Sequence, residues 1–111
     1  ALEPWYRRET GRFMEETCAV LAARHGLRYR RIIVRSQRRR WGSCSGKGTL
    51  SFNWRILLAP EAVARYLAAH ELAHLDQPNH SRRFWGKVTD LCPEWKDHER
   101  WLRKHGVGLS L

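Results

Sequence analysis

The sequence predicts an α+β fold: an N-terminal helix, a small antiparallel sheet with a β-hairpin, a helix that carries the candidate site, and two C-terminal helices. Residues 4–25 carry apolar side chains at helical spacing, whereas residues 49–54 alternate apolar and polar side chains. Residues 60–75 form an alanine-rich helical stretch, and two further helix-start signals follow it. With 111 residues, 42% of them hydrophobic, we expect one modest core and a single domain over residues 1–111.

Residues 4–25 are predicted to form an amphipathic helix. Pro4 suits its first turn, where a missing N–H costs no hydrogen bond. His25-Gly26-Leu27 is typical of a glycine-capped helix end followed by a hydrophobic contact, so we interpret His25 as a capping residue. The residues on the expected buried stripe are Tyr6, Thr10, Phe13, Met14, Thr17, Cys18 and Leu21.

Residues 28–35 change to a β-branched pattern around Ile32, Ile33 and Val34, which predicts a strand. Arginine fills most of the remaining positions. We interpret these arginines as the solvated face of the strand and of the turn after it. The alternative is a guanidinium cluster that grips phosphate or carboxylate groups. The seven arginines are Arg28, Arg30, Arg31, Arg35, Arg38, Arg39 and Arg40.

Residues 40–55 are predicted to form a β-hairpin. Its turn is Ser45-Gly46-Lys47-Gly48, and the strand after the turn alternates in character. The Gly-Lys-Gly sequence does not match a phosphate-binding loop, because the spacing from Gly42 is one residue too short and no Ser or Thr directly follows Lys47. We therefore expect one apolar face, packed on helices, and one polar face that lines a cleft.

The helical stretch at residues 60–75 contains the sequence His70-Glu71-Leu72-Ala73-His74, which reads H-E-x-x-H. Residues four apart lie on one face of a helix, so His70 and His74 can bind one metal ion together. Glu71 lies beside them, close enough to act on a bound water. Catalytic zinc takes three protein ligands and a water, so the pattern predicts one zinc ion, with another divalent metal as the alternative.

His80 is the candidate third ligand. It follows His74 by six residues, and Pro78 between them forces the helix to stop. A chain that turns back after this stop brings His80 towards the first two histidines. The sequence therefore predicts a site of three imidazoles with one carboxylate beside them.

Two C-terminal helices complete the predicted fold. Ser81 is expected to cap a helix over residues 82–91, whose apolar stripe would hold the backbone that carries His80. Pro93 is expected to begin a last helix that extends to about residue 105. His105-Gly106-Val107 repeats the capping pattern found at the end of the first helix.

Composition restricts the partners and the location. The 21 Lys and Arg residues exceed the 11 Asp and Glu residues, and the net charge of +10 favours polyanions such as nucleic acid or nucleotides. The three cysteines form no C-x-x-C pair, which argues against a disulfide framework and predicts a reducing, cytoplasmic location. No apolar run is long enough to cross a bilayer, so we expect no membrane partner.

Several segments together resemble the YgjP-like metallopeptidase domain, a family also described as predicted metal-dependent hydrolases. The resemblance extends from about Trp5 to Gly106. It implies a zincin-like fold related to the SprT and Wss1-type proteases, with three histidines as metal ligands (His70, His74 and His80) and Glu71 as general base. The segments that carry it are Arg40-Trp41-Gly42-Ser43-Cys44-Ser45, Leu58-Ala59-Pro60, His70 to Leu75, Asn79-His80-Ser81 and Phe84-Trp85.

The resulting hypothesis is a zinc-dependent hydrolase, a metallopeptidase that acts on a peptide or protein substrate. An extended peptide is expected to pair with the exposed edge of the hairpin near Thr49, Ser51 and Asn53. Asn53 or Arg40 would donate a hydrogen bond to the oxyanion. One alternative is a metal-dependent nucleoside triphosphate pyrophosphatase that holds phosphates with the arginine-rich strand. Another is a nucleic-acid-binding module with a structural metal, whose binding would weaken steeply as salt rises.

Overall fold

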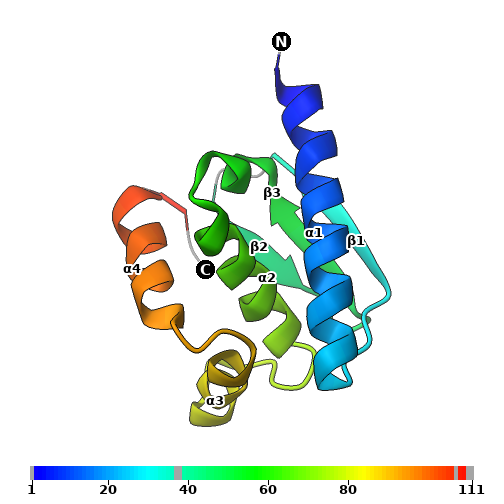
Figure 1. The fold of residues 1–111 in the computed structure, drawn as a ribbon, viewed down its shortest axis with the longest axis vertical. Helices are drawn as coiled ribbons and strands as arrows, with labels where there is room; N and C mark the ends of the chain where they lie inside the picture. Colours follow the sequence, from blue (N-terminus) through cyan, green and yellow to red (C-terminus); the bar gives the residue numbers. More distant parts are fainter. Residues whose placement is uncertain (1, 37–38, 107, 110–111) are drawn as a thin grey trace.

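The computed structural model describes residues 2–36, 39–106 and 108–109. Four α-helices, a short 3-10 helix and a small sheet surround one core, with α2 in the middle (Figure 1). The helix predictions are confirmed to within two residues at each end. In chain order the elements are α1 (Glu3–His25), β1 (Arg31–Arg35), β2 (Gly42–Cys44), β3 (Thr49–Asn53), η1 (Trp54–Leu58), α2 (Glu61–Ala73), α3 (Arg82–Leu91) and α4 (Trp95–His105).

The sheet has the strand order β1-β3-β2, so β3 is the central strand. β2 and β3 form the predicted antiparallel hairpin, with Ser43 opposite Ser51. The prediction of an antiparallel sheet is wrong for β1, which pairs with β3 in parallel, with Ile33 opposite Ser51. Turn residues determine a hairpin locally, whereas the place of β1 depends on its packing against α1, which no local pattern encodes. The sheet is therefore mixed.

α1 covers the sheet and ends as predicted. Its buried residues are spaced at four-residue intervals, and Gly11 faces Val34 of β1 across 3.7 Å, measured from the position of an added Cβ. Gly26 ends the helix at φ 67°, in the left-handed region that favours glycine. The buried residues of α1 are Thr10, Met14, Cys18 and Ala22.

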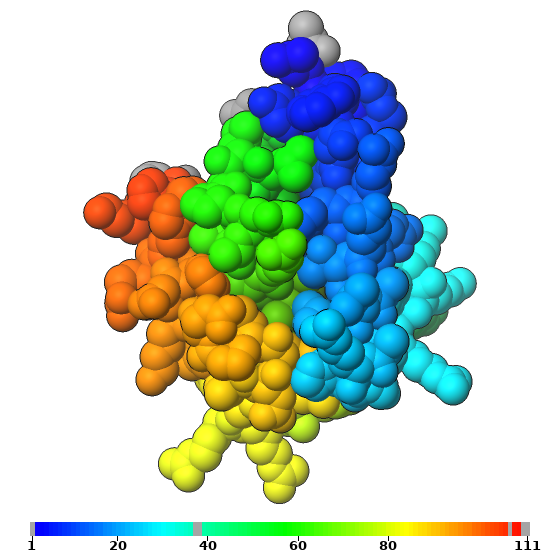
Figure 2. Space-filling view, viewed as in Figure 1, coloured from blue at the N-terminus to red at the C-terminus, as the bar shows by residue number. Residues whose placement is uncertain are grey.

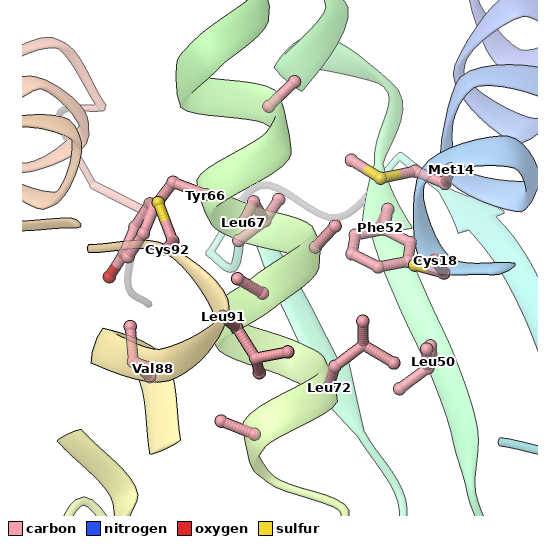
Figure 3. Close-up of a cluster of buried hydrophobic side chains, with 14 of the residues drawn as sticks. Met14, Cys18, Leu50, Phe52, Tyr66, Leu67, Leu72, Val88, Leu91 and Cys92 are labelled. Carbon is pink, nitrogen blue, oxygen red and sulfur yellow. The ribbon is translucent and has the colours of Figure 1, made fainter. Parts of the chain in front are cut away.

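α2 is buried on nearly all sides, which explains its high alanine content. The sheet and α1 pack on one side of α2, and α3 and α4 pack on the other (Figures 1 and 3). In Figure 3, Phe52 and Leu50 of β3 approach α2 from the sheet, while Val88 and Leu91 of α3 lie across from them. Glu61, Ala62 and Arg65 remain exposed near the start of this helix, whereas each buried polar side chain further along needs a partner inside the protein.

α3 begins as predicted, whereas α4 begins at Trp95, two residues after Pro93, and ends differently from the prediction. The Ser81 hydroxyl accepts a hydrogen bond from the Phe84 N–H at 3.3 Å and so caps α3. Gly106 follows α4 with φ −101°, so the prediction of a left-handed glycine cap is wrong there. Its lack of a side chain instead makes room for Trp41, since an added Cβ would lie 2.5 Å from the Trp41 Nε1. Val107, the last residue of the predicted cap, lies outside the described residues.

Gly106→Ala should destabilise the protein by about 1–3 kcal/mol, because the new methyl group would overlap both Trp41 and the Leu102 carbonyl oxygen, 2.8 Å away. Gly86→Ala is the matched control. Gly86 lies inside α3 with nothing within 4 Å of an added Cβ, so alanine should stabilise the helix by about 0.5–1 kcal/mol. Urea unfolding measures both variants. Equal midpoints would refute the close packing of α4 on Trp41.

The surface is strongly basic. Side chains of the segment that includes β1, cyan in Figure 2, project outwards from one side of the molecule. Arg28, Arg30, Arg31 and Arg35 are exposed there. Arg38 lies outside the described residues. Among the described residues, no helix is both long and apolar enough to span a bilayer.

Candidate metal centre

Three histidines from two neighbouring segments meet at one point. His70 lies on α2 and is 0% exposed, and His74 is the first residue after that helix. His80 precedes the capping residue of α3. One ring nitrogen from each histidine lies within 4.8 Å of the other two. The four-residue spacing on the helix and the turn around Pro78 therefore bring together the three residues that the sequence singled out.

The geometry of His74 and His80 fits a shared cation. The Nδ1 of His74 lies 3.0 Å from the Gln77 carbonyl oxygen, which makes Nδ1 the protonated nitrogen and leaves the lone pair on Nε2. That Nε2 lies 3.1 Å from the Nε2 of His80. Two nitrogens bound to one tetrahedral zinc are separated by about 3.3 Å. The pair is thus already close to the spacing that a metal ion requires.

His70 and Glu71 form a buried pair. Glu71 is 1% exposed, and its Oε2 lies 3.2 Å from the His70 Nδ1. A proton on Nδ1 directed at this carboxylate leaves the lone pair on Nε2. The Nε2 of His70 is buried and has no hydrogen-bond partner among the described residues. An orphaned imidazole nitrogen beside two further imidazoles is an arrangement that a bound metal ion would satisfy.

Aromatic residues of α3 hold the three rings in place. The His74 ring stacks on Phe84 with 4.3 Å between centroids, and the edge of His70 meets the same Phe84 at 5.0 Å. His80 packs against Trp85 at 5.9 Å. The apolar stripe of this helix was predicted to support the backbone of His80, and its aromatic residues also contact the imidazole rings of all three histidines. In the sequence, the adjacent aromatic residues Phe84 and Trp85 were the signal for this support of the histidine rings.

The pKa values of two histidines favour the form that binds metal. Burial lowers the pKa of His74, although the nearby Glu71 raises it in part. Burial, followed by the neighbouring His70 and His74, lowers the pKa of His80. Metal binding requires neutral imidazole, so both shifts reduce competition from protons near neutral pH.

A cleft of about 260 Å³ opens beside the cluster, between α2 and β2. Gly42 of β2 is essential to its shape, because an added Cβ would lie 2.9 Å from the Ser51 carbonyl oxygen and 3.0 Å from the Glu71 Oε2. The sequence reading did not assign Gly42 to the site, although a glycine inside a strand often indicates such a close approach. The cleft is lined by Arg40, Gly42, Ser43, Cys44, Glu71, His74, Pro78 and His80.

Of the residues expected to contact substrate, Arg40 is exposed, whereas Ser51 and Asn53 are buried. Arg40 is exposed and lines the cleft. Ser51 and Asn53 are only 7% and 2% exposed, because β3 is paired on both sides. Asn53 uses its side chain locally: its Nδ2 donates to the Arg40 carbonyl and its Oδ1 accepts from the Arg55 N–H. The free edge of the hairpin is therefore β2 rather than β3, which corrects the expected place of peptide pairing.

Cys44, in the cleft wall, should react slowly with iodoacetamide. Burial and then the charge of Glu71 raise the pKa of Cys44 to about 11. At pH 8 only about one thiol in 1,000 is then ionised, and labelling should accelerate about tenfold per pH unit up to about pH 10. Glu71→Gln removes the negative charge that helps to raise the pKa of Cys44, so this variant should be labelled faster. Peptide mass spectrometry gives the rates. A rate at pH 8 equal to that of a cysteine-containing peptide would contradict the shift.

The fold and the site define the class of protein. Two histidines lie one turn apart at the end of a buried helix with a carboxylate between them, a third histidine joins them, and a sheet edge borders the cleft. These are the features of a metal-dependent peptidase. The family model of the YgjP-like metallopeptidase domain matches residues 1–105, and the chain belongs to that family. This confirms the resemblance stated above.

Two metallopeptidase zymogens are among the solved structures that share this fold. The metallopeptidase zymogen abylysin of Pyrococcus abyssi is 26% identical, with a TM-score of 0.73, over 83% of this chain and 94% of that one. The metallopeptidase zymogen jannalysin of Methanocaldococcus jannaschii is 18% identical, with a TM-score of 0.64, over 82% of this chain and 95% of that one. The second likeness shows the fold alone. None of the curated proteins matches the chain.

Proposed function

We propose that the protein is a zinc-dependent metallopeptidase in which His70, His74 and His80 hold the ion and Glu71 acts as general base. The observation that carries this proposal is the convergence of three imidazole nitrogens within 4.8 Å of one another beside a buried carboxylate. Another divalent metal of similar ligand preference would fit the same three nitrogens. Membership of a metallopeptidase family supports the reaction class.

Glu71 is the residue that moves the proton. When bound, a zinc ion would supply Lewis acidity that polarises the scissile carbonyl and lowers the pKa of water to about 7. Glu71 lines the cleft and is placed to accept the proton that the attacking water loses. The same carboxyl group can then deliver that proton to the leaving amine. Gly42 keeps this path open, because it leaves room for the carboxylate at the cleft wall.

The free edge of β2 is the place where an extended peptide would bind. The Trp41 carbonyl accepts a hydrogen bond from the Asn53 N–H, and the Ser45 N–H donates to the Thr49 carbonyl. The backbone groups of the alternate residues Gly42 and Cys44 therefore point away from β3. A substrate strand that pairs with these groups would lie along the cleft beside the histidines. Arg40, two residues before the same strand, would donate to the developing oxyanion.

A parallel assay of two substrates tests the function. The zinc-loaded protein should cleave an unfolded protein such as reduced casein, as seen by mass spectrometry, and should release no pyrophosphate from nucleoside triphosphates. Chelation with 1,10-phenanthroline should abolish cleavage, and added zinc should restore it. Pyrophosphate release without peptide cleavage would replace the peptidase by the pyrophosphatase alternative. Activity that survives complete removal of metal would refute both hydrolase readings.

A further inference from the structure

A second cluster of metal-binding side chains lies where α3 ends and α4 begins. Cys92 directly follows α3, Glu94 precedes the first residue of α4, and His98 lies one turn further on. One donor atom from each lies within 4.8 Å of the other two. The Cys92 Sγ and the Glu94 Oε1 are 3.8 Å apart, close to the separation of about 3.5 Å between a sulfur and an oxygen on one tetrahedral zinc.

The local chain geometry holds these three side chains together. Pro93 fixes the backbone between Cys92 and Glu94, and the four-residue spacing places Glu94 and His98 on one face of α4. Glu94 stands at the N-cap position, yet its side chain makes no capping hydrogen bond. Its carboxylate turns to the Cys92 thiol instead, so it is available as a ligand.

The thiol is buried and the site borders solvent. Cys92 is 7% exposed, and burial followed by the charge of Glu94 raises the pKa of its thiol to about 11. The thiol therefore stays protonated unless a cation stabilises the thiolate. Cys92 and Glu94 also line a groove of about 440 Å³ between α1, α2 and the α3–α4 corner, so water can complete a coordination sphere. Figure 2 shows these segments meeting on one face, in blue, green and gold.

A buried polar atom beside the cluster has no partner. The Tyr66 hydroxyl is fully buried and makes no hydrogen bond among the described residues. In Figure 3, Tyr66 and Cys92 lie next to each other on the side of α2 that faces away from the sheet. The Tyr66 ring also packs against His98, with 6.4 Å between centroids. A metal-bound water at this corner would give the hydroxyl the partner that the protein does not supply.

We propose that Cys92, Glu94 and His98 bind one divalent cation with affinity for sulfur, such as zinc, at a site separate from the three-histidine cluster. Thiolate, carboxylate and imidazole form a donor set that zinc accepts and that magnesium and calcium avoid. The Cys92 S–H bond breaks as the sulfur binds the metal, and the proton leaves to solvent. The bound ion links the end of α3 to the first turn of α4, which packs against α2.

Cobalt(II), added alone to the metal-free and reduced protein, tests this proposal. The His74→Ala/His80→Ala double variant removes two ligands of the first cluster and leaves the second intact. This variant should bind one equivalent of cobalt and show the near-ultraviolet absorption of a thiolate-to-cobalt bond. The metal should also raise its unfolding temperature, because it binds only the folded state.

Further variants in the same background identify the sulfur. Cys92→Ser should abolish the absorption, whereas Cys44→Ser, which alters the thiol in the other cleft, should leave it unchanged. His98→Gln should weaken cobalt binding at least about tenfold and keeps the test valid if Cys92→Ser fails to fold by circular dichroism. An absent thiolate band, or a band lost with Cys44→Ser, would overturn the proposal. None of these outcomes depends on peptidase activity.

Discussion

Glu71→Gln should retain all bound metal and lose peptide cleavage by a factor of about 100 to 10,000, the usual contribution of a general base. The glutamine carbonyl can still accept the hydrogen bond that the His70 Nδ1–H donates, so the imidazole keeps its orientation. It cannot take a proton from water. Steady-state cleavage of a fluorogenic peptide measures the loss, and elemental analysis of the same samples measures the metal.

Glu61→Gln is the control for this variant. Glu61 lies in the first turn of the same helix, is exposed, and forms a surface ion pair of 3.1 Å with Arg65. Such pairs contribute about 0–1 kcal/mol, so activity and metal content should both stay close to the wild type. If Glu71→Gln cleaves peptide at the wild-type rate, Glu71 is not the base. If it loses metal as well as activity, its role is to orient His70.

Sequence periodicity predicted the helices well because helical contacts are local. The four-residue spacing in α1 and the start signals at Ser81 and Pro93 each depend on neighbours within one or two turns. The strand order was not predictable in this way. β1 pairs in parallel with β3, although β2 lies between them in the sequence. This pairing depends on packing between distant segments.

The candidate site was predictable in part for the same reason. The H-E-x-x-H spacing fixes the relation of His70 to His74, and Pro78 indicates the turn that returns His80. The alternation in β3 wrongly indicated an open polar face. Arg35 of β1 covers Ser51, with its Nε 3.4 Å from the Ser51 hydroxyl. The other residues of β3 are covered because the strand is paired on both sides. A period of two identifies two faces of a strand but not what lies over each of them.

The arginine cluster illustrates the difference between charge and function. Arg35 contacts Ser51, so at least one arginine of the cluster contributes to packing within the sheet. Among the cluster residues that the structure describes, Arg40 is the one that lines the cleft beside the histidines. The exposed arginines near β1 are therefore a surface feature, and Arg40 is the one that bears on the proposed reaction.

His80→Ala should bind one metal equivalent fewer than the wild type. His80 is exposed, so its removal from the metal-free protein should change the free energy of unfolding by less than about 0.5 kcal/mol. In the wild type, zinc at about 1,000 times its dissociation constant should add about 4.1 kcal/mol. The variant should gain far less, because only His70 and His74 remain at this site. Urea unfolding with and without zinc measures the difference, and elemental analysis counts the metal.

The proper comparison is another histidine that is exposed but distant from the site. His105 lies at the end of α4, where its Nδ1 is 3.0 Å from the Trp101 carbonyl oxygen. His105→Ala should keep the full metal content and the full stabilisation by zinc, since its ring contributes only to the helix end. The two variants separate a ligand from a surface histidine because they remove the same chemical group. An unchanged metal count in His80→Ala would show that the ion is held by His70, His74 and some other group, and Glu71 would then be the first candidate, since its carboxylate already lies 3.2 Å from the His70 ring.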